Sequence, residues 1–226
     1  MESTKIAIII PAYNEAETIS NVISELNNEL AMHNFTVFVV NDCSQDLTSL
    51  IASKAGATVI DLETNHGYSG AIEQGLNYVS SLGMDFHYAL TMDADGQHHP
   101  SSVKKIIEML ENDKPVLIVG ERYQCARFGE WLYGKVYNYL FGVRDPLCGL
   151  KAYSISAYRE IGVFETFDSI GSELMTKLIQ KGETYKVIPV IIRKRTDNAR
   201  FGNGLKVEIR LLKSLFSSIS YYLRSK

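Results

Sequence analysis

Residues 87–110 read HYALTMDADGQHHPSSVKKIIEML and contain an apolar run, an acidic turn and a helical pattern in that order. The run at 87–92 predicts a buried strand that leads directly into Asp93 and Asp95. Pro100 suits the first turn of a helix, which we expect over residues 101–110. The stretch therefore predicts one strand–turn–helix unit with two carboxylates at the carboxyl end of the strand.

Similar units are expected on both sides of this one. Strands are predicted at residues 6–10, 35–40, 58–61 and 116–119, and helices at 15–32, 46–54 and 68–81. Beyond Gly120 we expect helices near 129–141 and 172–180 and a strand at 187–193. Such alternation is typical of an α/β fold with a mainly parallel, Rossmann-like sheet flanked by helices. A chain of 226 residues with no internal repeat or linker is expected to form a single domain, 1–226.

The composition is that of a globular protein, with 46% hydrophobic and 22% charged residues, which argues against disorder. Cys43, Cys125 and Cys148 are odd in number and have no metal-ligand spacing, so we interpret them as small buried side chains in a reducing compartment. We find neither a secretion signal nor an apolar stretch long enough to span a membrane, and expect a cytoplasmic location.

The net charge of −3 conceals a basic C-terminal segment. From Arg193 onward there are nine basic and two acidic residues, a net charge of +7. This excess predicts a partner that carries negative charge, such as a phosphate or an anionic membrane surface, while a solvated face explains it equally well. No nucleic-acid partner is expected, and the oligomeric state is left open.

Polar segments follow four of the predicted strands, at residues 11–15, 41–44, 65–67 and 93–95. Ligands of open parallel sheets bind at the carboxyl ends of the strands, so these segments are expected to line one edge. Asp93, Asp95 and Gln97 offer only oxygen ligands, which suit Mg²⁺ or Mn²⁺ holding a diphosphate and acting as a Lewis acid. A surface turn explains the Asp-Ala-Asp-Gly spacing as well as a metal site does. Of His98 and His99, at least one is expected to be a plain surface histidine.

Several blocks in order resemble family 2 glycosyltransferases of the glycosyltransferase-A fold, particularly their polyprenyl-phosphate branch. These blocks are IIIPAYNEAETI (8–19), VVNDCSQDLT (39–48), NHGYSGAIEQG (65–75), TMDADGQHHP (91–100), GERY (120–123), DPLCGLKAYS (145–154) and ARFGNGLK (199–206). The ordered set covers nearly the whole chain and is far more specific than any single block. The resemblance therefore favours the metal site over the surface turn.

The resemblance implies a nucleotide-binding half at about 1–120, an acceptor half at about 121–203 and an amphipathic C-terminal helix at 204–226. It places Pro11, Tyr13 and Glu15 beside the base and ribose, with Asp42 accepting a hydrogen bond from the base. The full nucleotide set is Pro11, Ala12, Tyr13, Glu15, Asp42, Asn65, Gly67, Asp93 and Ala94. Ordinary packing of Tyr13 and a helix-start role for Glu15 are the alternatives.

Four residues depart from the family pattern. Asn41 stands where aspartate is usual and Cys43 where glycine is usual, so a shift in that loop is expected. Cys148 replaces a common serine and Lys151 a common arginine, next to the expected acceptor position. The identity of the acceptor is therefore open.

The resemblance also implies inversion at the anomeric carbon by a single displacement from a nucleoside diphosphate sugar. A polyprenyl phosphate acceptor is already ionised and needs no base, so Asp95 would act with the metal and cationic side chains would hold phosphates. The candidates for these phosphate contacts are Arg122, Lys135, Arg200 and Lys206. A sugar hydroxyl acceptor would instead need a carboxylate base, for which Glu173 is the candidate.

The C-terminal segment carries apolar residues at helical spacing beside a row of basic ones. The apolar residues are Leu205, Ile209, Leu212, Phe216, Ile219 and Leu223, and the basic ones are Lys206, Arg210 and Lys213. This pattern is typical of a helix at the cytoplasmic face of a membrane, while the helical period alone favours a helix packed on its own domain.

Two other classes of function are considered. A nucleotidyltransferase would need a glycine-rich basic loop after the first strand, where this chain has PAYNE. An inactive nucleotide-binding module is the other alternative, although the clustered acids argue against it. The base and the sugar of the donor are left open.

Overall fold

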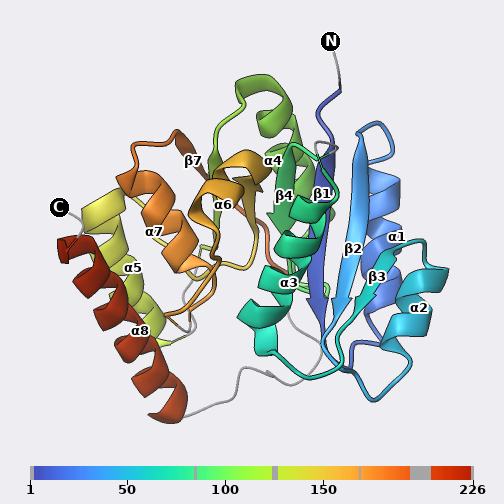
Figure 1. Cartoon of the computed structure of the whole chain (residues 1–226), viewed down its shortest axis with the longest axis horizontal. Coiled ribbons are helices and arrows are strands. Elements are labelled where there is room, and N and C mark those ends of the chain that lie inside the picture. Colours follow the sequence, from blue (N-terminus) through green and yellow to red (C-terminus); the bar gives the residue numbers. More distant parts are fainter. Residues whose placement is uncertain (1–2, 84–85, 124–126, 168, 194–204, 225–226) are drawn as a thin grey trace.

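The computed structural model describes residues 3–83, 86–123, 127–167, 169–193 and 205–224, with the side chains of residues 205 and 206 excluded. The strands are β1 (Ile6–Ala12), β2 (Phe35–Asn41), β3 (Thr58–Asp61), β4 (Tyr88–Thr91), β5 (Leu117–Glu121), β6 (Lys151–Ser154) and β7 (Tyr185–Pro189). The helices are α1 (Ile19–Glu29), α2 (Thr48–Lys54), α3 (Gly67–Ser81), α4 (Pro100–Asp113), α5 (Phe128–Phe141), α6 (Ile155–Ile161), α7 (Ser172–Gln180) and α8 (Leu205–Arg224). Helices and strands alternate through most of the chain (Figure 1).

The strands form one sheet in the order β3-β2-β1-β4-β6-β5-β7. β6 pairs antiparallel with both of its neighbours, β4 and β5, whereas the pairs β1–β2, β1–β4, β2–β3 and β5–β7 are parallel. The predicted α/β fold with a mainly parallel sheet is confirmed. Because the parallel strands point the same way, their carboxyl ends share one edge, and the loops that follow them meet there.

Each face of the sheet is covered by its own group of helices. One core contains apolar residues of α1, α2 and α4, among them Ile23, Ala52 and Ile106. The other contains residues of α3, α5, α6, α7 and α8, among them Leu76 and Tyr133. Figure 1 shows α5, α7 and α8 together at the end of the molecule opposite α2 and β3. β1 is buried along its whole length, as expected for a central strand packed on both faces.

Most element boundaries lie close to those predicted, with three clear differences. The first helix begins at Ile19 and not at residue 15, because Glu15 to Thr18 form a turn in which the Thr18 and Ile19 N–H groups both bond to the Glu15 carbonyl. The last strand lies at Tyr185–Pro189 and not at 187–193. β6 and α6 were not predicted, because their sequence, KAYSISAYREI, opens with a lysine and lacks a clear apolar period.

Candidate active site

A pocket of about 650 Å³ lies where the segments that follow β1, β2, β3, β4 and β5 meet. The residues that line it include every residue predicted for the nucleotide and the metal, together with Arg122. These residues are Pro11, Ala12, Tyr13, Glu15, Asp42, Asn65, Gly67, Asp93, Ala94, Asp95, Gln97 and Arg122. Residues from five separate sequence blocks thus converge on one cavity, whereas their individual roles stay predictions.

The loop after β1 is held against the loop after β2. Asn14 adopts a left-handed backbone with φ of 54°, and its N–H donates to Ser44 Oγ at 2.9 Å. Its side-chain oxygen accepts a hydrogen bond from the Gln45 N–H at 2.8 Å. The Glu15 N–H donates to Thr48 Oγ1 at 2.8 Å, and its carboxylate accepts from Thr18 Oγ1 at 2.9 Å. These bonds fix a nearly buried carboxylate at the pocket wall, where it can accept from a diol.

The loop after β2 places the Asp42 carboxylate, which is 3% exposed, at the pocket. Asp42 Oδ1 accepts the His66 N–H at 2.6 Å, and the Asn65 side chain donates to the Asp42 carbonyl at 3.1 Å. Asn41, where the family usually has aspartate, donates its amide to Asp61 Oδ1 at 2.7 Å. A carboxylate at residue 41 would face that of Asp61, so the amide is the compatible side chain.

Two further findings concern the cysteines. Cys43 is partly exposed, which corrects the expectation that it is buried. Its backbone is left-handed, with φ of 61°. A left-handed backbone at this position accounts for the glycine that is usual there. Cys148 is buried as predicted, and burial raises the pKa of its thiol to about 12. Cys125 lies outside the described residues.

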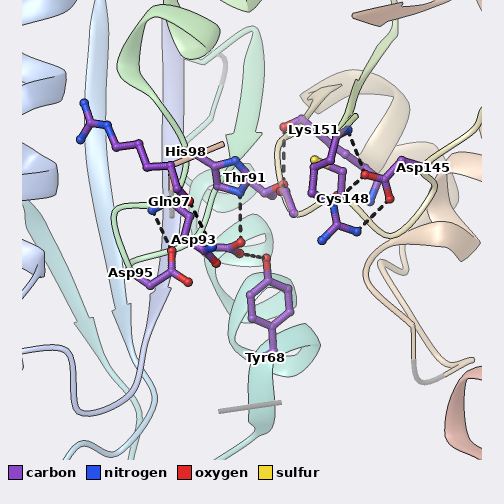
Figure 2. A network of polar contacts seen from close by, with 12 residues as sticks. Tyr68, Thr91, Asp93, Asp95, Gln97, His98, Asp145, Cys148 and Lys151 are labelled. Carbon is purple, nitrogen blue, oxygen red and sulfur yellow. Dashed lines mark hydrogen bonds and ion pairs between the residues drawn. The ribbon is translucent and has the colours of Figure 1, made fainter. Parts of the chain in front are cut away.

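Asp93 is anchored by two side chains from outside its own turn (Figure 2). Tyr68 donates its hydroxyl to Asp93 Oδ1 at 2.5 Å, and His98 Nε2 lies 3.0 Å from Asp93 Oδ2. Although burial raises the pKa of Asp93, the charge and hydrogen bond of His98, the Tyr68 hydroxyl and the charge of Arg122 together lower it to about 2. Burial and the neighbouring Asp93 charge raise the pKa of Tyr68 well above its ordinary value, so this hydroxyl remains a donor. The carboxylate is therefore ionised at neutral pH and fixed in orientation.

Gly149 allows this arrangement because it has no side chain. A Cβ atom at this position would lie 2.6 Å from both Asp93 Oδ1 and the Tyr68 hydroxyl. The Gly149 carbonyl accepts a hydrogen bond from Thr91 Oγ1 at 2.8 Å, which ties the glycine to β4. The sequence motif at 145–154 thus contributes backbone, as well as side chains, to the surroundings of the acids.

The histidines after the acidic turn differ from expectation, since neither is a plain surface residue. His98 is 4% exposed and forms an isolated bridge with Ile192, and His99 caps α4 by accepting the Ser101 N–H at 3.2 Å. Asp95 Oδ1 accepts the Gln97 N–H at 3.0 Å, which shapes the turn, and the Gln97 side chain donates to the Arg193 carbonyl at 3.4 Å.

Arg122 binds Asp145 in a bidentate ion pair beside the pocket. The Nε–Oδ2 distance is 2.6 Å and the Nη2–Oδ1 distance is 2.9 Å, and Glu130 lies 3.7 Å away. Burial alone would lower the pKa of Arg122. The hydrogen bonds and charge of Asp145 outweigh this effect, so the pKa lies above its ordinary value. Arg122 is therefore a permanent cation, and its planar group suits phosphate oxygens.

Several pocket residues were not predicted from the sequence. The cations are Arg127, at the start of α5, and Arg210 on α8; Tyr68, His98, Glu130, Gly149, Ile170 and Leu211 also line the cavity. Arg127 Nη1 lies 3.2 Å from Glu130 Oε1. Tyr68 and Gly149 lie inside the family-like blocks 65–75 and 145–154, so these motifs could have indicated that both residues belong to the site. Arg127 and Arg210 lie on helices whose placement depends on tertiary packing.

The predicted base and three of the predicted phosphate contacts are not found in the pocket lining, because they lie elsewhere or outside the described residues. Glu173 is 3% exposed, accepts from Thr166 Oγ1 at 2.7 Å and pairs with Lys177 at 2.6 Å, and it does not line the pocket. This placement counts against a catalytic role for Glu173. Lys135 is exposed on α5, with its ammonium 5.9 Å from the Trp131 ring, and is likewise not part of the lining. Arg200 and the side chain of Lys206 lie outside the described residues.

Comparisons with known proteins identify the family. The model of glycosyl transferase family 2 matches residues 7–161. The chain is 34% identical over 189 residues to a UDP-N-acetylglucosamine–dolichyl-phosphate N-acetylglucosaminyltransferase of Methanococcus voltae, covering 70% of this chain and 73% of the relative. It is 28% identical to a dolichol-phosphate mannosyltransferase of Pyrococcus furiosus, covering 82% of this chain but 55% of that relative.

A solved structure supports the fold. Glucosyl-3-phosphoglycerate synthase from Mycobacterium tuberculosis, in a complex with Mn²⁺ and UDP-glucose, superposes with a TM-score of 0.75 at 17% identity, covering 96% of this chain and 79% of the other. At this identity the likeness concerns the fold alone. The sequence matches and the fold agree, and the chain belongs to glycosyl transferase family 2 as a nucleotide-sugar-dependent glycosyltransferase with the glycosyltransferase-A fold.

Proposed function

We propose that this chain transfers a sugar, with inversion, from a nucleoside diphosphate sugar to a polyprenyl-phosphate-like lipid, with the help of Mn²⁺ or Mg²⁺. The observation that carries the proposal is the lining of the 650 Å³ pocket. Acids that suit a nucleotide and a cation come from the loops after β1, β2 and β4, and arginines that suit a second phosphate come from β5, α5 and α8. Two of the relatives also carry dolichyl or dolichol phosphate in their names.

The acidic turn fits a hard divalent cation. Asp93 and Asp95 are carboxylates at the pocket wall, and each carboxylate oxygen has more than one acceptor site, so the two hydrogen bonds to Asp93 leave lone pairs available. Within the described part of the chain, no three His, Cys, Asp or Glu side chains are placed to hold a metal by themselves. Diphosphate oxygens and Gln97 would therefore complete the set. A bound cation would supply neutralisation of the charge that develops on the departing nucleoside diphosphate.

The acceptor side favours a phosphate over a hydroxyl. A phosphate oxygen is already ionised near neutral pH, so the protein needs only to position it and screen its charge, and Arg122 and Arg127 in the pocket lining are the candidate cations for this. A hydroxyl acceptor needs a base, and Glu173 is held by Thr166 and Lys177 away from the lining. Glu130, which does line the pocket, is paired with Arg122 and Arg127. These contacts support the phosphate acceptor.

The outer faces of α8 and α5 support contact with a membrane surface. The inner face of α8 is packed through Val207, Leu211 and Leu215, so this helix forms part of the core. Its outer face exposes Ile209, Leu212, Phe216 and Leu223, and α5 adds Phe128 and Trp131, whose rings stack at 5.6 Å. Exposed Lys135 and Lys213 lie on the same helices. Within the described residues, no helix is both long and apolar enough to cross a bilayer.

The membrane contact is tested with point variants, because removing α8 would expose the core. We expect Leu212→Glu with Phe216→Glu to reduce co-sedimentation with vesicles that contain anionic lipid. Met32→Glu is the control and should bind as the wild type does, because Met32 is 95% exposed and follows α1, which lies at the opposite end of the molecule from α8 in Figure 1. Equal binding by the double variant and the wild type would exclude this surface.

The transfer reaction is tested in two stages. A thermal-shift panel of UDP, GDP, CDP and dTDP sugars, with and without Mn²⁺, identifies the donor, because a ligand that binds only the folded state raises the melting temperature. Transfer of that sugar is then compared between a polyprenyl phosphate and the matching polyprenol or a glycan. We expect transfer to the phosphate alone, with Glu173→Gln retaining most activity. Transfer to a hydroxyl, abolished in Glu173→Gln, would establish the alternative.

A further inference from the structure

Lys151 is a cation buried in the sheet beside the pocket. It is 1% exposed at the start of β6, where its backbone pairs with Thr91 of β4. Its ammonium donates to the backbone carbonyls of Cys148 and Ile170, each at 2.6 Å. Both of these acceptors are uncharged, and burial of an ammonium is costly. A neutral side chain would fill the same space at lower cost, so the ammonium is expected to have a specific task.

The two carbonyls belong to different segments of the pocket wall. Cys148 lies between Leu147 and Gly149, which both line the pocket, and Ile170 lines it from the loop before α7. These segments are distant in sequence, and the Lys151 ammonium bonds to both of them. Figure 2 shows Lys151 beside Cys148 and Asp145, on the side of the network away from Asp95. The spacing of the two segments therefore depends on this side chain.

The Cys148 segment also sets the position of the groups that surround the reaction. The Cys148 N–H donates to the Asp145 carbonyl at 3.3 Å, and the Asp145 side chain holds Arg122. Gly149 lies against the Asp93 carboxylate. The Ile170 segment is held from its other side, because the Ser169 carbonyl accepts from Ser69 Oγ at 2.6 Å. A shift at Cys148 would thus be passed to Arg122 through covalent and hydrogen-bonded neighbours.

We propose that Lys151 is a positioning residue for the acceptor: its ammonium joins the Cys148 and Ile170 segments and thereby fixes the part of the pocket that receives the acceptor phosphate. Lys151 does not touch the substrate and acts through these carbonyls and through Arg122. The inference rests on the proposed phosphate acceptor. Charge-assisted hydrogen bonds to two carbonyls hold the segments more firmly than neutral ones would.

The test compares two variants. Lys151→Met keeps the length of the side chain but loses its charge and its hydrogen-bond donors, whereas Lys151→Arg keeps the charge and the donors. Tyr137→Phe is the matched control, since it removes a buried 3.0 Å hydrogen bond to Thr176 that is remote from the pocket lining. We expect Lys151→Met to raise the KM for a short polyprenyl phosphate about tenfold or more, the equivalent of one charge-assisted bond. The affinity for a nucleoside diphosphate with Mn²⁺ should stay within about twofold, and Lys151→Arg should restore the KM.

Hydrogen exchange gives a readout that does not depend on activity. In Lys151→Met, amides in residues 145–150 and 169–172 should exchange faster, while those in β1 and β2 should not change. Tyr137→Phe should leave the exchange of both wall segments unchanged. If Lys151→Met does not fold, Lys151→Gln serves in the same comparison. Unchanged exchange and KM would overturn the proposal, as would equal losses of nucleotide and acceptor affinity in Lys151→Met and Tyr137→Phe. If the wild type transfers nothing to polyprenyl phosphate, the acceptor class is wrong, whereas the exchange data still decide whether Lys151 joins the two segments.

Discussion

Replacement of Gly149 by alanine should damage the acidic site while leaving the fold intact. The added Cβ would lie 2.6 Å from Asp93 Oδ1 and from the Tyr68 hydroxyl, whereas real Cβ contacts are essentially never closer than 3.0 Å. The carboxylate must therefore move by about 0.4 Å at least, and by about 0.8 Å to reach ordinary contact. A misplacement of this size costs on the order of 10²-fold in kcat/KM. Overpacking should also reduce the free energy of unfolding by about 1–3 kcal/mol.

Gly162→Ala separates damage to the site from loss of stability. Gly162 ends α6 with φ of 71°, and its added Cβ would meet nothing within 4 Å, so alanine there costs about 1 kcal/mol of backbone strain without touching the pocket. Transfer kinetics, urea unfolding and Mn²⁺ binding by electron paramagnetic resonance are measured for both variants with a saturating nucleoside diphosphate. We expect weak Mn²⁺ binding and low kcat/KM for Gly149→Ala alone. If folded Gly149→Ala binds Mn²⁺ and turns over like Gly162→Ala, the position assigned to Asp93 is wrong.

Three further predictions test other contacts. Tyr68→Phe removes the 2.5 Å hydrogen bond to Asp93 and should weaken Mn²⁺ binding about tenfold in the same resonance titration; unchanged binding would show that Tyr68 does not orient the acid. Arg122→Lys loses the bidentate geometry with Asp145 and should raise the acceptor KM about tenfold with nucleotide affinity unchanged; a normal acceptor KM would remove Arg122 from the acceptor site. Burial lowers the pKa of Lys151 from 10.5 to about 8. The nearby acids Asp145 and Glu165 oppose this fall, and the charge of Arg122 adds to it. Between these two pH values the folded state therefore binds fewer protons than the unfolded state. As the pH rises from about 8 to 10.5, the free energy of unfolding of the wild type, measured with urea, should increase by about 3 kcal/mol relative to Lys151→Met. A difference that does not change with pH would contradict the burial of a charged Lys151.

The sequence predicted the first half of the chain, residues 1–120, well, for a physical reason. In this half each strand is a short apolar run, and the polar residues that follow it lie on the shared edge because parallel strands point the same way. Knowledge of three loops was therefore sufficient to predict that Glu15, Asp42, Asp93 and Asp95 lie around one pocket.

The second half of the chain was predicted less well, because its geometry depends on packing between distant segments. β6 is a buried strand of only four residues that opens with Lys151, so its pattern resembles a loop. Arg127 and Arg210 reach the pocket because α5 packs on α8, which no local pattern indicates. Glu173 has the helix-start position expected of an acid, yet its carboxylate is held by Thr166 and Lys177.

The roles of the two adjacent histidines also depend on packing that the local sequence does not indicate. His98 and His99 are adjacent in sequence, but the bridge to Ile192 places His98 against Asp93, and the start of α4 engages His99 as a cap. Residues 191–193 follow the last strand and bond to the backbone of residues 97–99. This long-range contact, which the local sequence does not indicate, determines which histidine meets the acid.

The central claim is that a divalent cation and the diphosphate of the donor bind together at the acidic turn after β4. Crystals grown with Mn²⁺ and the nucleoside diphosphate identified by thermal shift would be measured at the manganese absorption edge. We predict an anomalous peak beside the Asp95 carboxylate that also contacts phosphate oxygens, and no such peak in Asp95→Asn crystals. Bound nucleotide without a peak at this turn, or a peak held elsewhere, would contradict the account.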